Sequence, residues 1–473
     1  MRRRLLHTAE VTPITDDLLA GLGRPTDAPR HALAVLGTDP VLPTRFRIGE
    51  AAAAVLAAQA VAAADLWCRR GGAAQAIEVD VRAAAASLVS FAWSQIDGVS
   101  LRRGAPATVA LYRSGDGGWV HLHGGFPHLH AGTLALLECR DDAGAIARAV
   151  AGWDAQELED ALAARGLCGA RLRSAAEWTA HPQGQALARA PLIELRRIGD
   201  APPTPLRGAS AGEPGARPAS GVRVLDLTRV LAGPTCARTL AEHGAEVLHV
   251  RSPRLPFIEP FVIDTNPGKR SCHLDLTRPD ESARLRMLCG EADVFAQGYR
   301  AGALARHGFD APHLAAIRPG IIAVDLDCYG HAGPWAARPG WEQLAQTVTG
   351  VAHEHGGTAA AAVIPAAAAD YITGHLAALG VLRALARRAD EGGSWHVRVS
   401  LARSAMWLQS LPRTPADAVA SGVSRAFLAP WSIEMDTAWG RLRRLGPIAR
   451  MSATPPGWAL PPAPLGSDPA AWA

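Results

Sequence analysis

One aspartate stands where a long helix is expected to begin. Asp370 follows an alanine-rich run and precedes Thr373-Gly374 and a stretch rich in alanine and leucine. At such a position a carboxylate can accept hydrogen bonds from the first helical amides, which is a structural role. The start of a helix also stabilises a negative charge, so it suits a reactive carboxylate too. From its local sequence alone, Asp370 is compatible with both roles.

Histidines are the other residues with the chemistry to form a site. Two of them, in His-x-His spacing on an expected strand, would place both rings on one face, as zinc ligands require. No cysteine or acid nearby completes a ligand set, so we predict that no metal is bound. The histidines concerned are His121, His123, His128 and His130, with His353 and His355 as a second group.

The elements that must position Asp370 begin near residue 221. Residues 221–227 form a short apolar strand, residues 235–243 a helix that Gly244 ends, and residues 245–250 a second strand. A strand, a helix and a strand in so short a stretch need a parallel sheet. The loop after the first strand lacks the pattern G-x-G-x-x-G, so the usual dinucleotide site is not expected.

Further motifs follow in a fixed order. They are Asn266-Pro267-Gly268-Lys269-Arg270-Ser271, residues 293–300, Tyr329-Gly330-His331-Ala332-Gly333-Pro334, Arg338-Pro339-Gly340-Trp341 and Asp370-Tyr371-Ile372-Thr373-Gly374. Their order and spacing resemble the family III CoA-transferases, which include formyl-CoA and carnitine-CoA transferases and a racemase branch. The resemblance implies an α/β fold, with a Rossmann-like large domain built on a parallel sheet and a second, smaller α/β domain.

The resemblance also implies site residues. Asp370 matches the family's nucleophile, which attacks an acyl-CoA thioester and then carries CoA as an aspartyl thioester. Arg306 is the expected phosphate partner because of its charge and donor geometry, and Lys269 and Arg270 would help to attract the phosphates. Positions that match CoA contacts are Val230, Leu274, Gly298, Tyr299, Arg306 and Tyr329.

The implied activity is that of an acyl-CoA:carboxylate CoA-transferase, with a CoA thioester as substrate and no permanently bound cofactor. Two alternatives stay open. A non-catalytic CoA-binding partner subunit is one, because Leu231 stands where these transferases often have Gln, and Asp327 and Cys328 also depart from the usual residues. The other is a 2-methylacyl-CoA racemase or related CoA-dependent isomerase, although Trp341 occupies the place of the racemase's histidine.

We expect six segments along the chain. They are an N-terminal arm (1–45), a helix and strand resembling a degenerate copy of 366–411 (46–95), a small α/β domain (96–200), a Pro/Gly linker (201–220), the Rossmann-like CoA-transferase domain (221–411) and a mostly irregular tail (412–473). An offset of 320 residues relates the copy to the original, and it pairs Glu50 with Asp370. The small domain precedes the catalytic half, whereas it usually follows it in the family.

Composition limits the remaining classes of function. With 473 residues, of which 48% are hydrophobic and 19% charged, the chain can bury the cores of two or more domains. A net charge of +4 from scattered arginines argues against a nucleic-acid partner. No apolar run free of charge and proline is long enough to suggest a membrane span. Seven dispersed cysteines without a Cys-x-x-Cys pair favour a reducing cytoplasm.

The resemblance also implies a homodimer, because two subunits interlock in this family.

Overall fold

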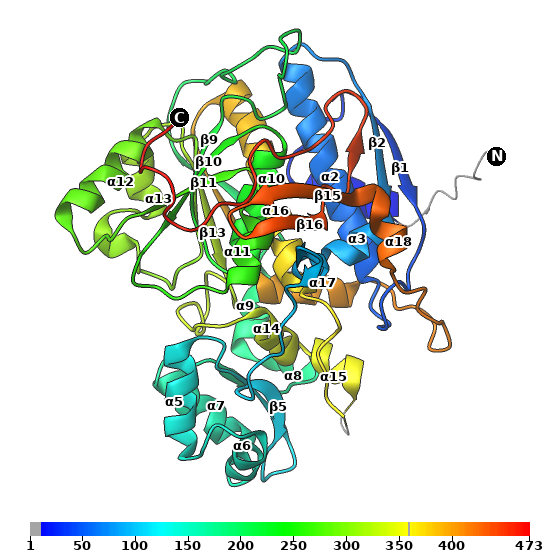
Figure 1. Cartoon of the computed structure of the whole chain (residues 1–473), viewed down its shortest axis with the longest axis vertical. Coiled ribbons are helices and arrows are strands. Elements are labelled where there is room, and N and C mark those ends of the chain that lie inside the picture. The colour runs from blue at the N-terminus through cyan, green and yellow to red at the C-terminus, as the bar shows by residue number, and fades with distance from the viewer. Residues whose placement is uncertain (1–10, 358–359) are drawn as a thin grey trace.

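A seven-stranded sheet forms the centre of the computed structural model, which describes residues 11–357 and 360–473 (Figure 1). The strand order is β11-β10-β9-β12-β13-β14-β8, and only β8 at the edge runs antiparallel to its neighbour. The expected βαβ unit and parallel sheet are confirmed. The strands are β8 (Glu194–Gly199), β9 (Arg223–Leu227), β10 (Glu246–Arg251), β11 (Lys269–His273), β12 (Val294–Gln297), β13 (Ile322–Asp327) and β14 (Ser394–Ser400).

Helices cover both faces of this sheet, as a parallel sheet requires. Val224 and its neighbours on one face pack in the same core as α10 and α16, whereas Leu225 on the other face packs with α12 and α13. Two short elements, α11 and η1, follow strand ends. These elements are α10 (Ala232–Glu242), α11 (Glu259–Thr265), α12 (Pro279–Glu291), η1 (Ala305–His307), α13 (Ala311–Ile317) and α16 (Ala368–Glu391).

The N-terminal segment forms a smaller unit that packs on α16. Its strands β1 and β2 are parallel, and β17 from the far end of the chain adds to β2. Helix α2 meets the length and hydropathy of a membrane span, but 94% of that apolar window is buried in the protein interior, so we interpret α2 as a core helix. The elements are α1 (Val11–Gly21), β1 (Ala32–Leu36), α2 (Ile48–Arg69), β2 (Ala76–Asp80), α3 (Val81–Ser87), α4 (Ser90–Trp93) and β17 (Arg450–Met451).

The same order of elements occurs twice. Helix α2, strand β2 and helix α3 in the N-terminal unit correspond to α16, β14 and α17 (Leu401–Ser410) in the large sheet. Strand β2 ends at Asp80 and β14 at Ser400, and the next helix starts one residue later in both. The offset of 320 residues seen in the sequence therefore also holds for the secondary structure, and α2 and α16 lie against each other (Figure 1).

A separate lobe lies below the main body (Figure 1). It holds a three-stranded sheet, β5-β6-β7, with three helices, and a further four helices link it to the body. Its elements are β5 (Val109–Arg113), β6 (Trp119–His123), α5 (Pro127–Leu137), α6 (Ala143–Val150), α7 (Ala155–Ala164) and β7 (Gly169–Arg171). The linking helices are α8 (Ala175–Ala180), α9 (Pro182–Ala188), α14 (Glu342–Thr349) and α15 (Val351–Gly356).

The expected segment boundaries need three corrections. Strand β8 belongs to the large sheet, so residues 96–200 are not one domain. Residues 1–45 contribute α1 and β1, so they are more than an arm. The tail is also partly regular, because β15 and β16 form a hairpin that pairs with β3. The elements of this last group are β3 (Gln95–Ile96), β4 (Val99–Ser100), α18 (Arg425–Leu428), η2 (Ala429–Trp431), β15 (Ser432–Thr437) and β16 (Gly440–Leu445).

Candidate active site

Asp370 lies in the first turn of α16, whose N-cap is Ala367. It is 9% exposed, and within the described part of the chain no group donates a hydrogen bond to its carboxylate or pairs with it as a cation. Burial, and then repulsion by Glu342, raise the pKa of Asp370 well above its usual range. The structure therefore holds this carboxylate without the partners that would make it inert.

The neighbouring acid, Glu342, begins α14. Its Oε1 atom accepts hydrogen bonds from the Gln346 side chain at 2.7 Å and from the Ala369 amide at 3.2 Å. Its buried Oε2 atom has no partner within the described residues. Burial raises the pKa of Glu342 to about 7. Two buried carboxyl groups thus lie near each other at the start of α16, an arrangement that disfavours both being ionised together.

Glu50, the counterpart of Asp370 in the N-terminal copy, has a different environment. It forms an ion pair with Arg47 at 2.6 Å, and its Oε1 atom accepts a hydrogen bond from the Asp39 amide. In return the Glu50 amide donates to the Asp39 carboxylate at 2.8 Å. These contacts give Glu50 a structural role at the start of α2.

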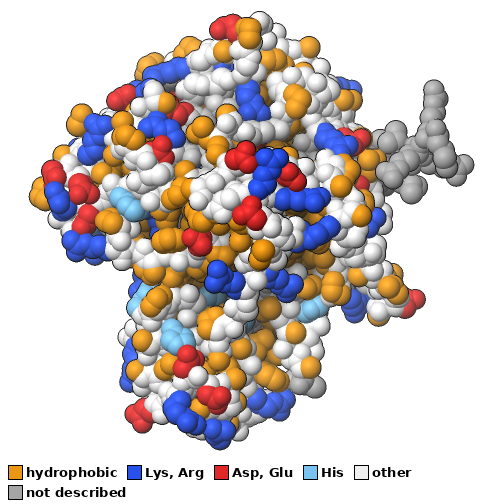
Figure 2. Space-filling view, viewed as in Figure 1, with side chains coloured by type: hydrophobic (Ala, Val, Ile, Leu, Met, Phe, Trp, Pro, Cys, Tyr) orange, Lys and Arg blue, Asp and Glu red, His pale blue; other side chains and the backbone are white. Residues whose placement is uncertain are grey.

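A cavity of about 450 Å³ opens where the carboxyl ends of β9 and β12 meet the small lobe, and we call it the strand-end cavity. Three of the six predicted CoA contacts line it: Val230, Gly298 and Tyr299. Carboxyl ends of parallel strands are where ligands bind in sheets of this kind. In the space-filling view the molecule narrows between the lobe and the main body (Figure 2).

Cys328 and Trp341 form part of the wall of the strand-end cavity. The Cys328 thiol lies 3.5 Å from the Trp341 carbonyl oxygen, to which it donates. Burial raises the pKa of Cys328 well above its usual range, and the nearby charges of Asp327 and Asp370 add to this rise. The charge of Asp370 therefore acts on this wall, although Asp370 is not one of the residues that line the strand-end cavity.

The other predicted contacts do not line this cavity. Leu274 is 5% exposed in the core under β11, and Tyr329 is 1% exposed against Trp335. Arg306 lies exposed on η1. Lys269 was also expected to attract phosphate, but its ammonium group is buried 2.7 Å from Asp226 and donates to the Pro234 carbonyl. Its role is to neutralise a buried carboxylate.

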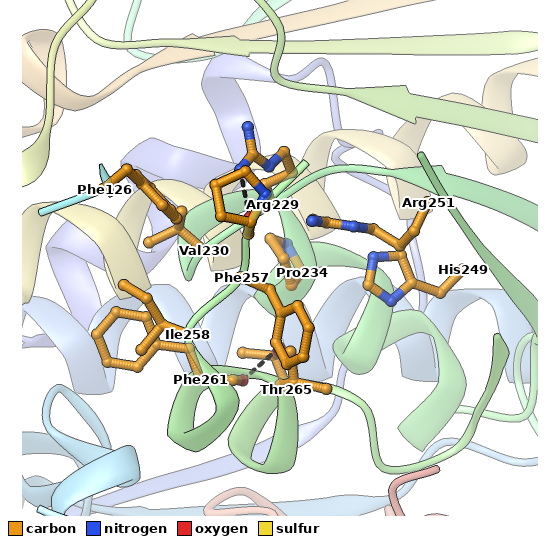
Figure 3. Close-up of a pocket in the computed structure, with 12 residues that line it drawn as sticks. Phe126, Arg229, Val230, Pro234, His249, Arg251, Phe257, Ile258, Phe261 and Thr265 are labelled. Carbon is orange, nitrogen blue, oxygen red and sulfur yellow. Dashed lines mark hydrogen bonds between the residues drawn. The ribbon is translucent and has the colours of Figure 1, made fainter. Parts of the chain in front are cut away.

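Two arginines that the sequence analysis did not select lie beside Val230. They line a narrow recess next to the strand-end cavity, which we call the arginine recess; Arg251 extends from the end of β10 toward Arg229 (Figure 3). Arg251 is 3% exposed, and its Nε and Nη2 atoms make no hydrogen bond within the described residues. Burial, and then the charge of Arg251, lower the pKa of Arg229 to about 10.

Arg229 lines both the recess and the strand-end cavity. Two adjacent guanidinium groups that lack a carboxylate partner form a site for an anion. In the sequence, these two arginines could have been selected only by their position. Arg229 follows the end of β9 and Arg251 ends β10, and ligands bind at this edge of a parallel sheet.

The turn that carries Arg229 is strained. Val230 has a φ of 70°, in a region that β-branched residues rarely adopt. Such strain persists only where the surroundings enforce it and is concentrated at functional sites. Here it presents Val230 to both the arginine recess and the strand-end cavity.

The histidines of the small lobe are engaged separately. His121 lies 3.0 Å from the Thr347 hydroxyl and His123 3.2 Å from the Gln343 side chain, while His130 lies beside Asp141. Among the residues that the structure describes, no group of three or more histidine, cysteine or acidic side chains is placed to hold a metal ion.

Comparison with known proteins places this chain in a family. The sequence profile of CoA-transferase family III matches residues 219–426. An acyl-CoA transferase of Gibberella moniliformis is 32% identical over 416 residues, which are 75% of this chain and 72% of that protein. Acetyl-coenzyme A transferase nodX of Hypoxylon pulicicidum is 33% identical over 63% of this chain and 54% of its own length. A succinate–glutarate CoA-transferase of Agrobacterium fabrum is 31% identical over 39% and 51%, respectively. The chain thus spans most of the first relative and about half of the other two.

Proposed function

The chain belongs to CoA-transferase family III, and we propose that it moves CoA from an acyl-CoA donor to a carboxylic acid through a thioester on Asp370. One observation carries this proposal: Asp370 is a buried carboxylate without a cationic or hydrogen-bonding partner in the described chain, and its charge acts on Cys328 in the wall of the strand-end cavity. The names of the relatives support the donor and acceptor classes.

The reaction balances in four displacement steps. The Asp370 carboxylate oxygen attacks the thioester carbonyl, the C–S bond breaks, and a mixed anhydride and CoA thiolate result. The thiolate attacks the Asp370 carbonyl carbon and releases the donor's acid. The acceptor carboxylate then attacks the aspartyl thioester, and the freed thiolate finally takes the acyl group of the acceptor. Asp370 is regenerated, and no step needs an outside proton or electron.

The surroundings of Asp370 favour this chemistry. A carboxylate that is stripped of water and of ion-pair partners is a better nucleophile than one in solution. A donor held in the strand-end cavity is also presented at high effective concentration. The anhydride and the thioester formed on Asp370 are close in energy to the corresponding anhydride and thioester of the substrate acids. The exchange is therefore reversible.

We assign the phosphates of CoA to Arg229 and Arg251 in place of the exposed Arg306. Arg229 faces the strand-end cavity, and Arg251 adds its charge from behind it. Two positive charges at a strand end would hold a diphosphate while the pantetheine arm follows the cavity toward Cys328 and Trp341.

Trapping the intermediate tests the proposal. Incubation with an acyl-CoA donor and no acceptor should load CoA onto Asp370, and hydroxylamine should convert that residue to a hydroxamate in its peptide. The variant Asp370→Asn should bind CoA within a few-fold of wild type and show no transfer. Wild-type transfer by Asp370→Asn would reject the nucleophile.

The same experiment separates the alternatives. A racemase would exchange the α-proton of a branched acyl-CoA with deuterium and leave CoA on its original acyl group. Trp341 argues against this, since its ring is stacked on His123 with centroids 5.2 Å apart and has no basic nitrogen. A non-catalytic partner subunit would bind acyl-CoA but form no adduct with any donor.

A homodimer in the cytoplasm stays part of the proposal. Sedimentation at micromolar concentration distinguishes a dimer from a single 49.5 kDa chain. A monomer would indicate that the N-terminal copy, which already packs on α16, takes the place of a partner's contact.

A further inference from the structure

A second large cavity borders the pair of carboxyl groups. It measures about 540 Å³, and we call it the side cavity. Glu342 lines the side cavity, whereas Trp341, one residue earlier, lines the strand-end cavity. Ala366 and Ala367, which lead into the helix of Asp370, form another part of its wall. Glu342 therefore belongs both to the carboxyl pair and to the wall of the side cavity, and this cavity adjoins the segment that leads to Asp370.

The walls of the side cavity are mainly apolar. One wall is the segment 89–93 of the N-terminal unit, with Val89, Phe91 and Trp93, and the facing wall is the segment 363–367. The segments come from opposite halves of the sequence and are tied together, since the Ala367 amide donates to the Leu88 carbonyl at 3.1 Å. A ligand in this cavity would gain by burying an apolar body.

The charges in the lining are distributed unequally. Glu342 is the one acid among the lining residues, and it belongs to the carboxyl pair. The two basic lining residues are Arg102 and Arg425, both exposed to solvent. Arg425 is fixed by bonds to the Trp93 carbonyl at 3.0 Å and the Gln95 side chain at 3.2 Å. The Arg102 side chain makes no hydrogen bond or ion pair within the described residues. Apolar and basic side chains lie together at the narrow waist of the molecule (Figure 2).

Size decides which acyl groups suit this space. Pockets that enclose drug-sized ligands measure about 300–1,000 Å³, and the side cavity falls within that range at about 540 Å³. A four-carbon succinyl group would leave most of the apolar wall in contact with water. An extended chain or ring would cover it.

We propose that the side cavity holds the acyl part of the substrate, and that this substrate is an extended acid with an apolar body and a second anionic group at its far end. The reacting carboxyl group lies at the Asp370 end, and the second anionic group lies at Arg102 and Arg425. The assignment rests on the proposed role of Asp370 as the residue that accepts the acyl group.

Binding without turnover tests this inference separately from the transferase activity. The full-length Asp370→Asn variant would be titrated calorimetrically with α,ω-diacids of four to twelve carbons and with the monoacids of the same lengths. We expect the affinity to rise with chain length beyond succinate, and a diacid to bind about fivefold more tightly than its matched monoacid, as an exposed ion pair allows. Tightest binding of succinate, or equal binding of diacid and monoacid, would overturn the proposal.

Substitutions of residues that line the side cavity test where the acid binds. Arg102→Gln and Arg425→Gln should each reduce the preference for the diacid and leave monoacid binding unchanged. Arg103→Gln is the matched control, because Arg103 is a neighbouring exposed arginine that does not line the cavity. Val363→Trp should shift the preferred length to shorter acids; an unchanged length profile would place the acid elsewhere. If the acids bind as expected but the wild type forms no CoA adduct, the transferase proposal fails and the cavity's ligand class stands.

Discussion

At the scale of single residues, Asp370 and Glu50 occupy equivalent places in two copies of one unit but differ in their surroundings. Glu50 is neutralised by Arg47 at 2.6 Å and is fixed by Asp39. Asp370 has only another acid beside it. The sequence motif selects Asp370 as the predicted nucleophile, but it did not indicate Glu342, because the proximity of the two acids depends on how α14 packs against the start of α16. Arg251 was missed for the same reason, since its lack of a partner is a property of the folded protein.

The charge of Glu342 should control the pH dependence of the reaction. Burial, and then the charge of ionised Glu342, raise the pKa of Asp370, which must be deprotonated to attack in the proposed reaction. In the wild type, kcat/KM should therefore fall as the pH drops through that raised pKa. Glu342→Gln keeps the shape and removes the repulsion, so the pKa of Asp370 falls and the acid limb should move to lower pH. A profile of kcat/KM between pH 5 and 9 measures this, and an unmoved limb would show that the two groups do not interact.

Arg251 should affect substrate binding more than turnover. Its guanidinium lies next to Arg229, where we place the phosphates. A charge-assisted contact contributes about 1.5–3 kcal/mol, so Arg251→Gln should raise KM for acyl-CoA by roughly tenfold to a hundredfold with little change in kcat. Arg306→Gln, at an exposed position outside the strand-end cavity, is the control and should stay within twofold. A larger increase in KM for Arg306→Gln than for Arg251→Gln would assign the phosphates to Arg306 instead.

At the scale of elements, the repeated helix, strand and helix explain how the site is built. The long alanine-rich helices α2 and α16 pack closely because alanine side chains are small, and 20 of the 24 residues of α16 are buried. The helices and central strands were predictable from apolar runs and from glycines that end them. The edge strand β8 and the β15–β16 hairpin were not, since their pairing partners lie far away in the sequence.

Gly374 should be intolerant of even one extra methyl group. A Cβ atom there would lie 2.3 Å from the Ala232 carbonyl oxygen and 2.8 Å from the Thr235 Cβ, where α16 crosses α10. Overpacking of this kind costs about 1–3 kcal/mol, so Gly374→Ala should lower the thermal unfolding midpoint and reduce kcat, since Asp370 is one turn away. Gly290→Ala in α12, with nothing within 4 Å, is the control. It should keep or raise the midpoint, because alanine favours a helix over glycine by about 1 kcal/mol. Equal midpoints for the two variants would show that the helices can separate at no cost.

At the scale of the whole molecule, the N-terminal copy helps to complete the single site. Its segment 89–93 forms one wall of the side cavity. Ser90 donates a hydrogen bond to Asp264 at 2.8 Å, and Asp264 also accepts one from Tyr371, the residue after Asp370. The order of the segments in the sequence gave no sign of this, because residue 90 and residue 371 meet only in the folded chain. One copy carries the unpaired carboxylate of Asp370, and the other copy lines the side cavity.

This division of roles predicts one intermediate per chain, whatever the oligomeric state. Saturation with an acyl-CoA donor in the absence of acceptor should add a single CoA to each polypeptide in its intact mass, and the adduct should map to the peptide of Asp370. Glu50→Gln should leave the amount of adduct and kcat within about twofold of wild type. It should lower the unfolding midpoint, because the ion pair with Arg47 is lost. Such a contact contributes about 0–1 kcal/mol when exposed and more when buried, as it is here. Asp370→Asn should give no adduct and keep its midpoint, since no described group depends on that carboxylate. Two adducts per chain, or an adduct that survives Asp370→Asn, would show that the N-terminal copy has kept its own chemistry and that its ion pair opens in solution.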